Sequence, residues 1–155
     1  MTRINVIDPT QLTDQHLMAE YRELPMVMGS LRRTLISKNG WQPAKVSSEY
    51  TLNKGHVYFF TNKGGWLKRR YAALVIELYE RGFQLDPARK ADFTVFEDNG
   101  LDGAWTADQS ALEVNRARIR ERIESKPSWY RYYGYKITEC GMLPALSNPD
   151  HIWKY

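Results

Sequence analysis

Asp14-Gln-His-Leu-Met-Ala-Glu-Tyr-Arg-Glu-Leu24 opens a long periodic pattern of apolar residues. Apolar side chains recur three and four positions apart, which predicts a helix over residues 14–37 that is buried on one side. Glu23 lies off the apolar stripe, on a side of the helix that it shares with His16 two turns earlier. The stripe consists of Leu17, Tyr21, Leu24, Met28, Leu31 and Leu35. The opposite face carries Arg22, Met26 and Arg33.

The charges beside Glu23 have two interpretations. Charged residues on a helix usually form a solvated face, and that interpretation stands beside a functional one. Pro25 favours function, because its ring and missing N–H bend or break a helix at a cost of about 3 kcal/mol. A backbone fault next to a lone carboxylate is common at functional sites.

The start of the chain offers a nucleophile. Thr2 is small, so we expect Met1 to be removed and the amine of Thr2 to be free. An N-terminal amine has a reference pKa of about 7.7–8.0, against about 10.4 for lysine, so a useful fraction is unprotonated near neutral pH. The cations Arg3 and Arg22 would lower that pKa further, because like charges disfavour the ammonium form.

Several stretches together resemble a known family. Thr2-Arg-Ile-Asn5, followed by residues 14–25, is similar to the opening of the phage endonuclease V family, the pyrimidine-dimer DNA glycosylases. The likeness continues in order to about residue 136, so we divide the chain into a glycosylase-like domain, 1–136, and a C-terminal extension, 137–155, packed on it or flexible. The later similar stretches are Gly55-His-Val-Tyr-Phe-Phe60, Arg81-Gly-Phe83 and Trp129-Tyr-Arg-Tyr-Tyr-Gly134.

The resemblance implies an activity. Family members excise cyclobutane pyrimidine dimers by attack of the N-terminal amine on a sugar, and the resulting imine allows β-elimination that nicks the strand. By position, Thr2 would be the nucleophile, and Glu23 would stabilise the cationic sugar and shuttle protons. Met26 departs from the family, where arginine is expected. The implied DNA contacts are Arg3, Gln15, His16, Arg22, Arg118, Arg122, Trp129, Tyr130 and Arg131.

The implied partner is double-stranded DNA that contains pyrimidine dimers or abasic sites. Most contacts would be to phosphates, with the lesion recognised through the deformability of the duplex. No cofactor is implied, and three scattered histidines with one cysteine do not make a metal site. Two alternatives stay open: a non-catalytic protein that binds bent or damaged DNA, and a basic protein associated with RNA.

Composition fits a DNA-binding globular protein. A chain of 155 residues predicts one domain, and the net charge of +4 is unevenly distributed. Residues 61–82 and 113–136 carry net charges of +3 and +4, whereas residues 86–108 carry −4, and such clustering can hold a polyanion on one side. The single cysteine excludes an internal disulfide and indicates a reducing compartment. With no visible signal peptide and no apolar run near 20 residues, we expect a cytoplasmic monomer of a bacterium or viral host cell, used at the nucleoid.

The predicted fold class is all-α, a single compact domain of three main helices with long irregular loops. The second and third helices are expected over about 63–81, capped by Thr61 or Asn62, and about 107–125, capped by Thr106 or Asp108. Arg118 and Arg122 share a face of the third helix. A short extended piece is expected at 57–60, preceded by His56, which is either a structural histidine or part of the active site. Residues 83–106 are expected to be a surface loop.

Overall fold

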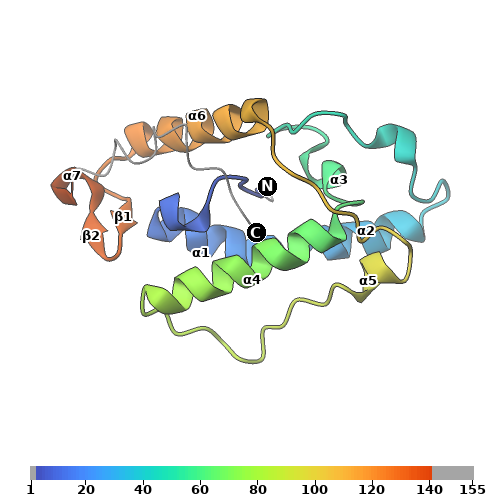
Figure 1. The fold of residues 1–155 in the computed structure, drawn as a ribbon, viewed down its shortest axis with the longest axis horizontal. Coiled ribbons are helices and arrows are strands. Elements are labelled where there is room, and N and C mark those ends of the chain that lie inside the picture. The colour runs from blue at the N-terminus through green and yellow to red at the C-terminus, as the bar shows by residue number, and fades with distance from the viewer. Residues whose placement is uncertain (1–2, 141–155) are drawn as a thin grey trace.

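Three long helical parts carry the structure (Figure 1). The first is α1 (Asp14–Glu23) with α2 (Met26–Leu35), the second is α4 (Gly64–Glu80), and the third is α6 (Gln109–Ser125). The computed structural model describes residues 3–140 and the side chains of residues 3–138. The predicted fold class, mostly helical and compact with long loops, is confirmed.

The helix expected over residues 14–37 is in fact two helices, and the prediction of one continuous helix was wrong. The break falls at Leu24 and Pro25, because proline has no N–H for the helical hydrogen bond. The N–H of Leu24 still bonds to the carbonyl of Glu20 at 2.8 Å, whereas that of Val27 bonds to Leu24 in a tighter turn. The predicted burial is confirmed for Leu17, Tyr21, Leu24, Met28 and Leu31.

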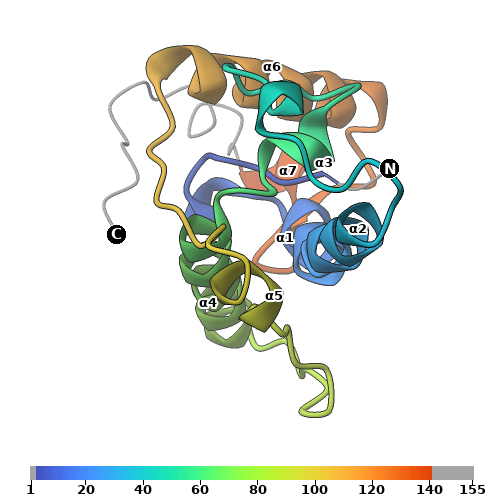
Figure 2. The ribbon, with the colours of Figure 1, turned by 90° about the vertical axis from the view of Figure 1, so that its right-hand side faces the viewer.

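The N-terminal segment, residues 3–8, passes between α6 and α4 in both views of the molecule (Figures 1 and 2). Its side chains Ile4, Val6 and Ile7 are fully buried, which anchors the segment in the core. It has no strand partner in the described part of the chain, so side chains satisfy its backbone. The N–H groups of Val6 and Ile7 both donate to Oδ1 of Asn115, at 2.8 and 3.2 Å.

The start of α4 is not capped by Thr61 or Asn62, and that prediction was wrong. The residue before the helix is Lys63, which makes no side-chain cap. Instead, the N–H groups of Gly64 and Trp66 donate to the carbonyls of residues 101 and 103, at 3.0 and 3.3 Å. A Cβ on Gly64 would lie 2.4 Å from Phe96, so glycine permits this close approach.

Two regions expected to be irregular or extended contain short helices. Residues 57–60 do not form an extended piece, because His56–Phe59 is a helix, α3, that follows Gly55 in the left-handed conformation (φ +89°). Phe59 and Phe60 pack edge-on against one another in a cluster of aromatic rings, so packing overrides their preference for strands. Residues 83–106 loop away from the body (Figure 2) but include a short helix, α5 (Thr94–Glu97).

The third helix leads into a hairpin that is held against the start of α1. Asp108 caps α6 as predicted, accepting the N–H of Ala111 at 2.8 Å. In the hairpin, β1 (Arg131–Tyr132) pairs antiparallel with β2 (Tyr135–Lys136), and α7 (Ile137–Cys140) ends the described chain. The N–H groups of the turn residues Tyr133 and Gly134 donate to the carboxylate of Asp14. Ile137, the first residue of the expected C-terminal extension, is buried, and residues 141–155 lie outside the described part.

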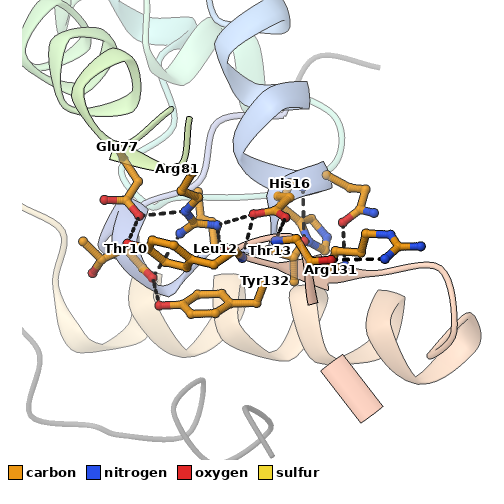
Figure 3. A network of polar contacts seen from close by, with 12 residues as sticks. Thr10, Leu12, Thr13, His16, Glu77, Arg81, Arg131 and Tyr132 are labelled. Carbon is orange, nitrogen blue, oxygen red and sulfur yellow. Dashed lines mark hydrogen bonds and ion pairs between the residues drawn. The ribbon is translucent and has the colours of Figure 1, made fainter. Parts of the chain in front are cut away.

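Arg81 connects the end of α4 to α1 and to the short 3-10 helix η1 (Pro9–Gln11) (Figure 3). Its guanidinium donates to Glu77 at 2.7 Å, to Asp14 at 2.9 Å and to the carbonyl of Leu12 at 2.7 Å. The hydroxyl of Tyr132 donates to the carbonyl of Thr10, which joins the hairpin to the same network. These contacts fix the hairpin beside the N-terminal turn of α1, the helix that carries His16 and Glu23.

Candidate active site

A small pocket of about 70 Å³ opens between the N-terminal segment, α1 and α6, and we call it the Glu23 pocket. It brings together five of the residues singled out in the sequence, from positions 3 to 122. Those five are Arg3, His16, Glu23, Arg118 and Arg122. The remaining lining residues are Asn5, Ala19, Glu20, Leu52 and Ile119.

Glu23 forms a hydrogen bond with Arg3, the first residue that the structure describes. Its Oε2 accepts the backbone N–H of Arg3 at 2.9 Å, a contact between residues twenty positions apart. Within residues 3–138, no lysine or arginine side chain lies within ion-pair distance of this carboxylate. Thr2, the predicted nucleophile, lies outside the described residues.

Glu20, the second carboxylate in the pocket, is fully neutralised. Its two oxygens accept from Nε and Nη2 of Arg70 at 2.7 and 2.8 Å, and both side chains are completely buried. Asn5 donates a further hydrogen bond to Oε2 of Glu20 at 2.9 Å. Glu23 is therefore the acidic group of the pocket that a cation or a proton can still engage.

Three arginines line the pocket with buried Nε atoms. Among the described residues, the Nε atoms of Arg3, Arg118 and Arg122 have no hydrogen-bond partner. Burial lowers the pKa of Arg3, and the charges of Arg122 and Arg118 lower it further. Guanidinium groups that repel one another and keep unsatisfied donors form a receptor for an anion, and phosphate fits their geometry.

His16 is a neutral member of the pocket. Burial, with the charges of Arg3 and Arg122, lowers the pKa of His16 to about 4. Its Nδ1 lies 2.7 Å from the hydroxyl of Thr13, and its ring stacks on Tyr130 with centroids 4.8 Å apart (Figure 3 shows His16 beside Thr13). The Thr13 hydroxyl also accepts the backbone N–H of His16, so its own hydrogen is available to Nδ1. The imidazole proton is then on Nε2, and His16 carries no charge near pH 7.

Four other predicted residues line a second, larger cavity of about 520 Å³, which we call the Trp129 cavity. These are Gln15, Arg22, Trp129 and Arg131. Ala19 lines both cavities, so they are neighbours along α1. The amide of Gln15 is occupied: it donates to the carbonyl of Trp129 at 2.7 Å and accepts the N–H of Arg131 at 2.9 Å. Trp129 itself is 64% exposed.

The predicted site residues within the described part of the chain thus gather around α1, the C-terminal half of α6 and the hairpin. A comparison of the sequence with known protein families bears on what these residues belong to. The sequence model of the family described as pyrimidine dimer DNA glycosylase matches residues 1–91. The chain belongs to the pyrimidine dimer DNA glycosylase family.

Membership of the pyrimidine dimer DNA glycosylase family makes DNA the substrate and base excision in DNA repair the activity. The matched region contains Arg3, His16 and Glu23, while Arg118 and Arg122 join the pocket from beyond it. The described side chains, those of residues 3–138, include no cluster of three metal-ligating groups. Within residues 3–140, no helix has the length and apolarity that a membrane span requires.

Several residues that build the Glu23 pocket were not found from the sequence. Asn115, Asn5, Glu20 and Arg70 form, in that order, a buried chain of hydrogen bonds that reaches the pocket lining at Asn5 and Glu20. The sequence does contain an indication of two of them, because Arg70 and Asn115 are polar residues within the apolar stripes of their helices. His56 is buried and both of its ring nitrogens have hydrogen-bond partners, as expected of a structural histidine, and one of those partners is the N–H of Ile4 in the N-terminal segment.

Three successive basic residues of α4, Lys68, Arg69 and Arg70, do not act as a unit. Arg70 points into the core, whereas Lys68 pairs with Glu97 at 2.9 Å on the surface. Met26, which replaces the arginine expected from the family, is 55% exposed on α2.

Proposed function

We propose that this protein is a pyrimidine-dimer DNA N-glycosylase that is also an abasic-site lyase. Its nucleophile is the primary amine of Thr2, and Glu23 is the catalytic carboxylate. The observation that supports this assignment is the hydrogen bond from the N–H of Arg3 to Oε2 of Glu23. No metal or cofactor takes part in the proposed reaction.

Covalent geometry links that hydrogen bond to the amine. The nitrogen of Thr2 is one residue from the nitrogen of Arg3, a span of roughly 3.6 Å at most. The nitrogen of Arg3 lies 2.9 Å from the Glu23 carboxylate. If the mature chain begins at Thr2, covalent geometry would limit the distance from its amine to Oε2 of Glu23 to about 6.5 Å, which supports the proposed pairing.

The proposed chemistry proceeds through an imine. The lone pair of the amine attacks C1′ of the 5′ nucleotide of the dimer, and the glycosidic bond breaks with its electron pair going to the base, which takes up a proton. Opening of the sugar ring gives the protonated imine. Loss of a proton from C2′ then sends electrons toward the imine and expels the 3′ phosphate, and water finally hydrolyses the imine to regenerate the amine.

Glu23 and the arginines would stabilise charges of opposite sign in the bound DNA. Glu23 faces the positive charge that develops on the sugar and can accept and return the protons of the amine and of C2′. Arg3, Arg118 and Arg122 would bind phosphates on either side of the lesion. The same cations disfavour the ammonium form of the nearby amine, which increases the fraction that can attack.

The proposed DNA surface continues into the Trp129 cavity. Arg22 and Arg131 would contact the backbone, and the exposed ring of Trp129 offers a stacking surface for a base. Gln15 holds the hairpin that presents this ring, and Tyr130 supports His16. The partner is duplex DNA with pyrimidine dimers or abasic sites, bound by a monomer in the cytoplasm where the nucleoid or viral DNA is exposed.

Borohydride trapping tests the proposal. The protein is incubated with duplexes that carry one pyrimidine dimer or one abasic site, and borohydride reduces any imine to a stable adduct. Native protein should form the adduct. Thr2→Ser should form it too, because serine is also small, so Met1 is removed and the chain begins with the primary amine of residue 2. Thr2→Leu, whose bulky side chain retains Met1, should not, and mass spectrometry of the intact chains verifies each N-terminus. Binding of both duplexes without any adduct would instead indicate a non-catalytic protein that binds damaged DNA.

A further inference from the structure

Both backbone polar groups of Ile4 form hydrogen bonds with side chains that have no role in the chemistry proposed so far. Its N–H donates to Nε2 of His56 at 2.8 Å, and its carbonyl accepts from the hydroxyl of Tyr50 at 2.8 Å. All three residues are buried, with exposed fractions of 0% for Ile4, 2% for His56 and 7% for Tyr50. We call His56 and Tyr50 the Ile4 clamp.

The clamp requires a neutral imidazole. Because Nε2 of His56 accepts a backbone N–H, that nitrogen carries no proton. The ring proton is then on Nδ1, which lies 2.5 Å from the carbonyl of Thr51 and donates to it. A second proton on the ring would set an N–H against the N–H of Ile4 and break the contact.

The clamp acts on the same short segment as Glu23. His56 holds the N–H of Ile4 and Glu23 holds the N–H of Arg3, so two consecutive amides are fixed by side chains from two different helices. Further along, Asn115 holds the amides of Val6 and Ile7. The segment that leads to the N-terminal amine is therefore positioned by side chains instead of by a sheet.

We propose that His56 is a positioning residue for the imine chemistry: its neutral ring holds Ile4, and thereby keeps the Thr2 amine within reach of Glu23 and the sugar, and protonation of the ring releases the amine. The inference rests on the proposed function. A displacement of about 1 Å in a reacting group can lower a rate by about 100-fold, so release of one anchor is sufficient to slow the reaction.

The groups around His56 keep the clamp closed at neutral pH. Burial lowers the pKa of His56, its hydrogen bond to Thr51 raises it, and the charge of Arg3 lowers it. The rings of Tyr50 and Phe60 lie edge-on to the imidazole, at 5.5 and 5.4 Å. Burial keeps Tyr50 un-ionised by raising its pKa, with Glu20 and Arg70 acting on that hydroxyl in opposite directions. The charge that acts on His56 is thus a cation, which opposes protonation of the ring until the solution is acidic.

The test compares His56→Ala, His56→Gln and Tyr50→Phe with native protein in single-turnover borohydride trapping on duplex DNA with one abasic site. His56→Ala should trap 10- to 100-fold more slowly while its Kd for the duplex changes less than twofold, because no clamp atom lines the DNA surface. In His56→Gln, the amide oxygen can accept the N–H of Ile4 and does not titrate, so most of the rate should return. The acid limb of its rate-against-pH profile should move to lower pH than that of native protein.

The outcomes separate this inference from the proposed function. Native protein that forms no adduct would overturn both. Native protein that forms the adduct, with a folded His56→Ala that traps equally fast, would overturn the positioning role and leave the proposed function standing. If His56→Ala does not fold, the decision rests on His56→Gln and Tyr50→Phe: an unshifted acid limb in the first, together with an unchanged rate in the second, would overturn the role of the clamp.

Discussion

Two groups of arginines in this protein differ in the partners of their guanidinium groups. Arg70 and Arg81 are engaged by carboxylates and backbone carbonyls, and they join α4 to α1 and to the N-terminal segment. Arg3, Arg118 and Arg122 line the Glu23 pocket, and their buried Nε atoms have no partner in the described part of the chain. Unpartnered donors alone do not define this group, because Arg116 also has an Nε and an Nη2 without a partner among the described residues and does not line the pocket; what sets the three arginines apart is that their unpartnered donors meet at one pocket.

The largest expected effect belongs to the paired group. Arg70→Met leaves the carboxylate of Glu20 buried without a cation, which should lower the free energy of unfolding by about 3–5 kcal/mol. Urea denaturation measures the change. The double variant with Glu20→Leu should recover part of the loss, because it removes the unpaired charge. A loss below about 1 kcal/mol for Arg70→Met would show that Arg70 is not structural.

The pocket arginines should affect DNA binding and have little effect on stability. Arg118→Gln and Arg122→Gln remove like charges from a crowded pocket, and the Arg118 variant loses only a long, exposed contact with Glu121 at 3.4 Å, so neither should cost more than about 1 kcal/mol of stability. Each should lower the slope of log K against log salt by about 0.9, the value for one lost phosphate contact. Fluorescence anisotropy over a salt series measures this slope. Unchanged slopes in both variants would remove these arginines from the DNA interface.

The neutral histidine of the same pocket should make stability depend on pH. The pKa of His16 is about 4 in the folded state and 6.5 for an unperturbed histidine, so the unfolded chain binds a proton first as the pH falls. Stability contributed by neutral His16 is present above about pH 6.5 and is lost toward about pH 4, with a slope of up to about 1.4 kcal/mol per pH unit. Urea unfolding of His16→Gln should show a shallower dependence in that window, and parallel curves would contradict the assignment.

The smallest effect is expected from an exposed ion pair away from the pocket. Arg32 and Asp92 lie 2.7 Å apart with side chains 48% and 58% exposed. Arg32→Gln removes one positive charge, as the pocket variants do, and should cost less than about 1 kcal/mol of stability. It is the charge-matched control for DNA binding, because its salt slope should stay close to that of native protein.

The sequence predicted the parts of the fold that depend on local periodicity. The bounds of α4 and α6 agree with the expected ranges to within about two residues, and the cap at Asp108 is confirmed. Pro25 is recognisable as a fault, but the apolar pattern continues on both sides of it and predicts one helix. The helix at residues 56–59 was missed because Val, Tyr and Phe favour strands, and here aromatic packing decides the conformation.

The pocket could be predicted only in part. His16 and Glu23 share a helix face, so their proximity followed from periodicity, and Arg118 with Arg122 followed in the same way. Periodicity could not predict the path of the N-terminal segment. The contacts that fix this path join residues distant in the sequence, such as Val6 and Asn115. Such contacts depend on tertiary packing, and only the polar interruptions in the apolar stripes indicated them.

The identity of the amine that forms the imine decides whether the proposed chemistry is right. The adduct with abasic DNA, reduced by borohydride and digested with nuclease and protease, can be mapped by mass spectrometry. Lys63 is a rival amine, since burial lowers its pKa to about 8, although its Nζ is occupied by the carbonyl of Phe59 and by Asn62. We expect the sugar-derived mass on the peptide that begins at Thr2. The same mass on a peptide that contains Lys63, or on any other lysine, would contradict the proposed nucleophile.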